Sequence, residues 1–168
     1  MVYEAIDTDR VIDHLNMMVE LELALDDVFE GAILATDDRL VREELARYRE
    51  STRYHRDLSV ELLARYGSAP QPKDVLSSLV VDIEVGLTGG RKRQRELHRL
   101  QGLSVVVLLS RSNWEIVGLL VLAVGDQVMA ERIEGVVRDK NEQLDWVRKQ
   151  IVDLGQRTLV RRRLSRSI

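Results

Sequence analysis

Residues 41–66 read VREELARYRESTRYHRDLSVELLARY, and the spacing of apolar residues in this stretch decides the fold. Residues that recur at steps of three and four share one face of an α-helix, and an apolar stripe of this kind packs against a protein core. The stripe consists of Val41, Leu45, Tyr48, Thr52, His55, Ser59, Leu62 and Tyr66. Its middle is polar, so the predicted helix brings the imidazole of His55 into the interior.

A second helix with the same property precedes it in the chain. Its stripe consists of Val11, Leu15, Met18, Glu22, Leu25, Phe29 and Ala32. A carboxylate or an imidazole that faces a core is costly unless a partner satisfies it. In helical bundles a metal pair held by side chains of facing helices is a common partner. Glu22 and His55 together therefore predict a polar site inside a bundle of helices.

The remaining pattern predicts a single all-α domain with two helical hairpins. With 168 residues, only two prolines and no cysteine, the chain suits long uninterrupted helices without disulfides. The predicted parts are a first hairpin over 9–66, a crossover over 67–102, a second hairpin over 103–154 and a basic C-terminal tail over 155–168. Short loops inside each hairpin make its two helices antiparallel neighbours. We therefore expect an antiparallel four-helix bundle.

Capping residues, glycines and prolines indicate where the predicted helices begin and end. Thr36-Asp37-Asp38 can end the first helix and cap the second, and Gly67 with the prolines after it ends the second. We expect a further helical stretch over 74–88 in the crossover. A long apolar pattern over 91–124 is predicted to be kinked or broken near Gly102. Gly125-Asp126 marks the turn before a last helix that starts near 127.

Two segments resemble motifs of the ferritin-like superfamily. Residues 52–58, TRYHRDL, are similar to its second-helix motif, and residues 139–147, DKNEQLDWV, to the fourth-helix motif of bacterioferritin-type members. The resemblance covers both hairpins and rests on spacing, on the Asp-Trp-Val run and on the turn at 125–126. It implies a ferritin-like bundle of the bacterioferritin or rubrerythrin type, a cytoplasmic location, and homodimers formed through helix faces.

The resemblance also implies six positions for the ligands of a di-iron centre. Such centres take one Glu from each of two helices and a Glu-x-x-His pair from each of the other two, because positions i and i+3 share a helix face. The positions carry over onto Glu22, Thr52, His55, Ser110, Lys140 and Gln143. Thr, Ser and Gln are poor iron ligands, and a lysine ammonium repels a cation. We therefore expect the centre to be lost and no cofactor to be bound.

Lys140 gives the sharpest hypothesis. It falls in the gap of an apolar stripe of the last helix, so we expect its ammonium to replace the charge of the metal and to pair with Glu22 in the core. The alternative is that Lys140 extends to the surface while His55 bonds to Thr52, to a neighbouring helix or to water.

A different helical register would keep an acidic site. It places Glu142 and Asp145 inward with Glu115 opposite, so that they join Glu22 and His55 as ligands of an iron or manganese pair. Periodicity opposes this register, because Glu142 and Asp145 share a helix face with Arg138 and Lys149, as on a solvated surface. Three other acidic residues, Glu20, Asp26 and Glu30, lie off the centre of the first stripe and are expected to be exposed.

Three functions follow from these patterns. The first is a structural, stress-associated or protein-interaction role for a bundle without its metals, with no catalytic residue. The second is a non-haem di-iron or di-manganese oxidase, or a ferroxidase-like protein, with atypical ligands. The third is the binding of a small ligand between the helices at the emptied centre.

Charge and hydropathy bound the partners. The net charge is −3, so no nucleic acid is expected; Arg161, Arg162 and Arg163 form a local basic cluster that suits a weak anion contact at most. The most apolar segment, 103–124, is interrupted by polar residues, which predicts a buried core helix and no transmembrane segment. Its run of apolar residues over 105–109 predicts that this helix is covered on more than one side, by the crossover or by a second subunit of a homodimer.

Overall fold

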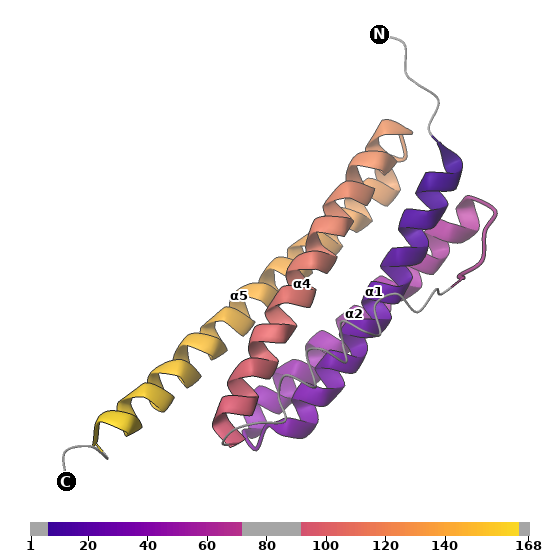
Figure 1. Ribbon diagram of the computed structural model, residues 1–168. Helices are drawn as coiled ribbons and strands as arrows, with labels where there is room; N and C mark the ends of the chain where they lie inside the picture. The colour runs from indigo at the N-terminus through magenta and orange to yellow at the C-terminus, as the bar shows by residue number, and fades with distance from the viewer. Residues whose placement is uncertain (1–6, 72–91, 165–168) are drawn as a thin grey trace.

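The computed structural model describes residues 7–71 and 92–164, and within this part it is all-helical, with no strand. The four helices are α1 (Thr8–Ala35), α2 (Arg39–Arg65), α4 (Lys92–Ala123) and α5 (Gln127–Leu164). They pack along one another, α1 against α2 and α4, and α5 against α4 and α2 (Figure 1). The predicted all-α, four-helix fold class is thus confirmed at this level.

The helix ends lie where the capping residues predict them. The Asp7 side chain accepts a hydrogen bond from the backbone N–H of Arg10 at the start of α1, and Asp38 does the same for Leu40 and Val41 at the start of α2. These bonds satisfy N–H groups that have no partner inside a helix.

Two glycines end helices in the same way. Gly67 (φ 71°) follows α2 and Gly125 (φ 78°) follows α4, both in the left-handed conformation that glycine adopts without strain. After each of them, the next backbone N–H turns back to bond a carbonyl five residues earlier, Ser68 to Leu63 and Asp126 to Val121. The Asp126 side chain then accepts from the N–H of Met129 and so caps α5. The chain therefore reverses direction within three residues between α4 and α5.

Two boundaries differ from the prediction. Helix α4 begins at Lys92 and runs as one helix through Gly102, so a break of the helix at this glycine is wrong. Leu100 and Leu103 on either side of the glycine are both buried, and this burial outweighs the roughly 1 kcal/mol that a helical glycine costs. Helix α5 continues to Leu164, so most of the predicted tail is helical. The predicted stretch 74–88 and the side chains of Arg161–Arg163 lie outside the described residues.

The apolar core consists of two clusters with a polar layer between them. One cluster contains Leu15, Met18, Leu62, Val117 and Ile133, and the other contains Leu25, Phe29, Leu45, Val107 and Val147. Along every helix the residues between the two clusters are polar and buried: Glu22 on α1, Thr52 and His55 on α2, Ser110 on α4, Lys140 and Gln143 on α5. The stripes predicted from the sequence are thus buried, polar middle included, except that Val41 and Tyr66 at the two ends of the second stripe are half-buried.

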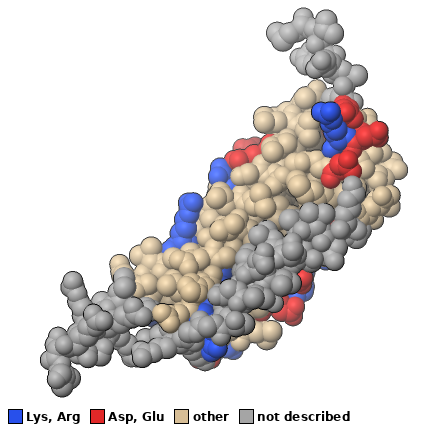
Figure 2. Space-filling model, viewed as in Figure 1, with Lys and Arg blue, Asp and Glu red and all other residues tan. Residues whose placement is uncertain are grey.

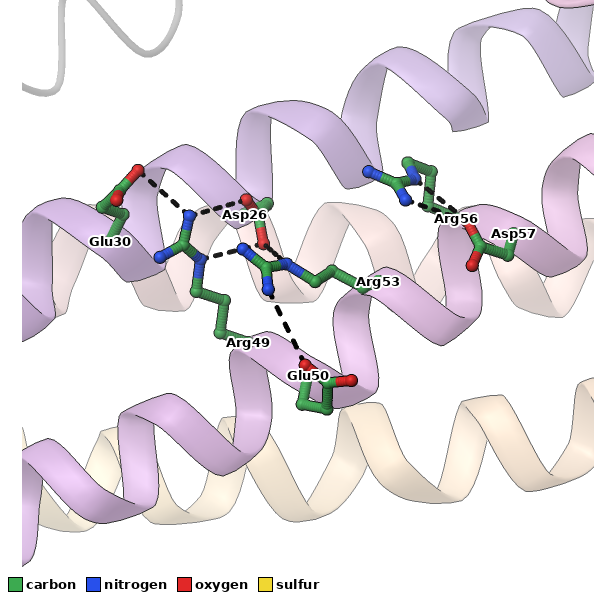
Figure 3. Close-up of polar contacts among 7 residues, drawn as sticks. All are labelled: Asp26, Glu30, Arg49, Glu50, Arg53, Arg56 and Asp57. Atoms are coloured by element: carbon green, nitrogen blue, oxygen red, sulfur yellow. Dashed lines mark hydrogen bonds and ion pairs between the residues drawn. The ribbon is translucent and has the colours of Figure 1, made fainter.

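A cluster of ion pairs joins α1 to α2 at their outer edge (Figure 3). Arg49 donates two hydrogen bonds of 3.0 Å to the two carboxylate oxygens of Asp26, and Arg53 donates a third of 2.9 Å. Burial alone would raise the pKa of Asp26, but the two guanidinium groups outweigh it and lower the pKa. The expectation that Asp26 is exposed is wrong, because the two arginines cover it and its side chain is only 13% exposed. Glu20 is also buried, so the same expectation is wrong for it. Glu30 is exposed, as expected.

This arrangement predicts the effect of removing Asp26. The substitution Asp26→Ala leaves two guanidinium groups without their shared acceptor, so we expect the free energy of unfolding at pH 7 to fall by about 1–3 kcal/mol in urea titrations. Since its pKa is lower in the folded state, the contribution of Asp26 is complete above pH 3.8 and disappears as pH falls further. The control is Asp57→Ala, which removes the exposed pair with Arg56 and should cost less than ~0.5 kcal/mol. Equal losses in the two variants would contradict the interpretation.

Candidate functional site: the buried polar layer

The carboxylate of Glu22 lies at the centre of the polar layer and accepts three hydrogen bonds. Its Oε2 accepts from Lys140 Nζ at 2.7 Å, and its Oε1 accepts from Ser110 Oγ at 2.5 Å and from Trp114 Nε1 at 2.9 Å. The donors come from α4 and α5, so one side chain of α1 links three helices. A buried carboxylate with three donors, one of them charged, has the satisfaction that burial requires.

Lys140 is completely buried and forms an ion pair with Glu22. Burial lowers its pKa, because a charged ammonium is disfavoured away from water, and the attraction of Glu22 opposes this shift. The predicted pairing of Lys140 with Glu22 is therefore confirmed, and the alternative, that Lys140 reaches the surface, is wrong. The reason is positional: residue 140 lies between the buried Val136 and Leu144, on the inner face of α5.

His55 lies beside this ion pair and is neutral. Burial, followed by the repulsion of Lys140, lowers the pKa of His55 to about 2. Its Nε2 lies 3.2 Å from Asp139 Oδ2, so Nε2 carries the proton and donates to the carboxylate. The contact is thus a hydrogen bond of a neutral ring to an acidic side chain. Burial, with the nearby Glu142, raises the pKa of Asp139.

Ser51 joins His55 and Asp139, but the three do not form a nucleophilic triad. Ser51 Oγ lies 3.4 Å from His55 Nε2, and Asp139 Oδ2 lies 3.2 Å from the same nitrogen. In a Ser-His-Asp triad the serine and the acid use different ring nitrogens, so that the ring can take the serine proton while the acid holds it in place. Here both contacts share one nitrogen, and the geometry does not activate the hydroxyl.

Three other atoms of the layer are buried without a hydrogen-bond partner among the described residues. They are Thr52 Oγ1, His55 Nδ1 and Gln143 Oε1, which all belong to positions where the resemblance implies metal ligands. An unsatisfied buried polar group typically costs about 1–3 kcal/mol. Gln143 keeps one long contact, from its Nε2 to Ser51 Oγ at 3.5 Å. The layer is therefore well satisfied around Glu22 and poorly satisfied between α2 and α5.

The residues of the layer do not fit a di-iron or di-manganese centre. Glu22 and His55 are suitable ligands, but the ammonium of Lys140 lies 2.7 Å from a carboxylate oxygen that would bind the metal. The alternative ligands Glu115, Glu142 and Asp145 are exposed, so the register that placed them inward is wrong. Within residues 7–71 and 92–164, no three His, Asp or Glu side chains converge on a point where they could hold a metal ion.

Some residues of the layer were not found from the sequence. Trp114 follows Ser110 by one helical turn on the buried face of α4, and this spacing was a signal in the sequence that Trp114 faces the same layer. Its indole N–H bond to Glu22, however, depends on how α1 and α4 pack together. Ser51 and Asp139 lie beside the stripes and not on them. Only their contacts across α2 and α5 bring them to His55.

No protein-family model matches the sequence, and no curated protein matches it.

One helical segment, Gln94–Ala123 in α4, is long and apolar enough to cross a membrane by length and composition. The same segment contributes Ser110 and Trp114 to the bonds with Glu22, and its inner face belongs to both apolar clusters. A core helix of a bundle has these properties too, so the segment alone is weak evidence for a membrane span.

The ion pair predicts strong coupling between residues 22 and 140. Lys140→Met leaves the buried Glu22 without its counter-charge, and we expect the free energy of unfolding to fall by about 3–5 kcal/mol. Adding Glu22→Gln removes the stranded charge, so the double variant should be more stable than Lys140→Met alone. Urea denaturation of both single variants and the double variant gives the coupling energy. Additive effects would contradict the pairing.

The neutral His55 predicts a loss of stability in mild acid. Its pKa is about 2 in the folded protein and 6.5 when unfolded, so below pH 6.5 the unfolded chain binds a proton that the folded protein does not. We expect this residue to lower the free energy of unfolding by about 1.4 kcal/mol per pH unit as pH falls from 6 to 5. His14, whose pKa burial also lowers, adds to the slope. The measurement therefore compares His55→Gln, expected to have a shallower slope, with the exposed control His98→Gln, expected to keep the native slope.

Proposed function

We propose that this chain is a ferritin-like four-helix bundle in which the Glu22–Lys140 ion pair has taken the place of a di-iron centre. In this proposal the protein has a structural, stress-associated or protein-interaction role in the cytoplasm, and not an oxidase activity. The observation that carries the proposal is the ammonium of Lys140, buried at 0% exposure and bonded to Glu22 at the middle of the bundle. A cationic side chain in the position of a metal stabilises the remaining carboxylate and excludes a metal cation.

The positions of the six residues support the ferritin-like part of the proposal. Glu22, Thr52, His55, Ser110, Lys140 and Gln143 all have exposures of 1% or less. They come from four helices and lie in one layer between the two apolar clusters. The superfamily resemblance implies this convergence.

The contacts between helices support the same assignment. Between α1 and α4, Glu22 bonds Ser110 and Thr36 bonds Glu96, so residue numbers rise along one helix as they fall along the other. Between α2 and α5, His55 contacts Asp139 and Glu61 accepts from Arg132. Both pairs of helices therefore run in opposite directions, as the ferritin-like arrangement requires.

Metal analysis tests the functional part of the proposal. The protein is produced in medium that contains added iron and manganese, purified without chelators, and measured by inductively coupled plasma mass spectrometry. We expect no stoichiometric iron or manganese in the native chain. Two metal ions per chain, lost in His55→Ala, would overturn the proposal and favour a di-iron or di-manganese oxidase.

A restored variant tests the structural part independently. The four substitutions Thr52→Glu, Ser110→Glu, Lys140→Glu and Gln143→His rebuild the implied ligand set around Glu22 and His55. We expect the variant, refolded with Fe²⁺ or Mn²⁺, to bind two ions per chain and to melt at a higher temperature with metal than without. The matched control keeps Lys140 and carries the other three substitutions, and it should bind no metal pair. A four-substitution variant that folds but binds no metal would show that the ferritin-like assignment is wrong.

A further inference from the structure

Four polar side chains of the buried layer, all on α2 and α5, have hydrogen-bonding groups that no described residue satisfies. Thr52 Oγ1, His55 Nδ1 and Gln143 Oε1 are buried without a partner among residues 7–71 and 92–164. Lys140 belongs with them, because its ammonium carries three N–H groups and the described residues give it one hydrogen bond, to Glu22. All four residues have 0% exposure, so bulk water does not reach these groups.

The unsatisfied groups of α2 lie next to those of α5. Thr52 and His55 are three residues apart on α2, so they share a helix face. The same spacing places Lys140 and Gln143 on one face of α5. Ser51 links the two faces, since its Oγ lies 3.4 Å from Nε2 of His55 and 3.5 Å from the amide nitrogen of Gln143. The four groups therefore belong to one junction between the two helices.

The chemistry of the four groups defines what can join them. The neutral ring of His55 donates from Nε2 to Asp139, so its Nδ1 has a lone pair and can only accept. Gln143 Oε1 is also an acceptor only. Lys140, in contrast, has further N–H groups to donate, and the hydroxyl of Thr52 can donate as well. The junction thus has two acceptors and two donors to satisfy.

We propose that one internal water molecule binds between α2 and α5 and bridges these four groups. Water donates two hydrogen bonds, here to His55 Nδ1 and Gln143 Oε1, and accepts two, here from Lys140 Nζ and Thr52 Oγ1. Buried waters typically make about three hydrogen bonds to groups that the protein leaves unsatisfied. The ammonium of Lys140 repels a cation from this position, and an anion would leave the two acceptors without a donor. A neutral molecule that both donates and accepts is therefore the matching occupant.

The exchange route of this water lies at Asp139. The side chain of Asp139 is 49% exposed and accepts from His55 Nε2, so this contact separates the layer from the solvent. The hydroxyl of Ser51, 3.5 Å from the same carboxylate oxygen, completes the boundary. The surface along α4 is largely uncharged by comparison (Figure 2). The water therefore exchanges slowly with the solvent, because the ring of His55 must move before the water can leave.

The sign of a stability change tests the bridge. Thr52→Val removes the hydroxyl and nearly keeps the shape of the side chain. If the hydroxyl bonds to the water, the variant breaks a satisfied contact, and we expect the midpoint of urea unfolding to fall. Removal of an unsatisfied buried hydroxyl would raise the midpoint instead. The same reasoning applies to Gln143→Met. Thr8→Val, at an exposed position of α1, is the control for valine in a helix and should leave the midpoint unchanged.

Nuclear magnetic resonance tests the water directly. We expect ¹⁷O magnetic relaxation dispersion to count one more long-lived water in the native chain than in the double variant Thr52→Val with Gln143→Met. In ¹⁵N spectra of the native chain, His55 should carry its proton on Nε2, and the signal of Nδ1 should lie at a lower chemical shift than in the double variant, because it accepts a hydrogen bond. The proposal is overturned if either single variant raises the unfolding midpoint, if the two water counts are equal, or if Nδ1 carries the proton.

Discussion

The ion pair between Glu22 and Lys140 is the interaction on which the rest of this structure depends. Two opposite charges are removed from water at the middle of a bundle of 27- to 38-residue helices, and neither is tolerable there alone. The other polar groups of the layer are arranged around this ion pair. Ser110 and Trp114 complete the bonding of the carboxylate, and the positive charge of Lys140 helps to keep the nearby His55 neutral. A neutral ring can then share the interior with a cation.

Much of this arrangement was predictable because it depends on periodicity. Glu22, His55 and Lys140 each fall on or in the gap of an apolar stripe, and periodicity places residues of such a stripe on the inner face of the helix. The pairing of Lys140 with Glu22 was one of two alternatives from the sequence, the other being that Lys140 extends to the surface, and the structure decides between them. The exposure of Glu142 and Asp145 followed in the same way from the positively charged residues on their face of the helix.

Other features were not predictable because they depend on where two helices touch. Asp26 lies off the centre of its stripe, yet it is nearly buried because two arginines of α2 close over it. Asp139 reaches His55 only through the packing of α2 against α5. The continuity of α4 through Gly102 is a third case, in which burial of the neighbouring leucines outweighs a local preference that the sequence expresses plainly. Single-helix patterns do not encode such contacts between elements.

The division of the core into two apolar clusters has a consequence for how the helices are aligned. Leucine and valine residues on either side of the polar layer are interchangeable enough that a helix could slide by one turn, about 5.4 Å, and still bury apolar surface. Such a slide of α5 would move Lys140 toward one of the apolar clusters and leave the buried Glu22 without its counter-charge. The polar layer therefore fixes the register of the four helices along the bundle axis. This specificity lowers the stability of the fold relative to an entirely apolar core.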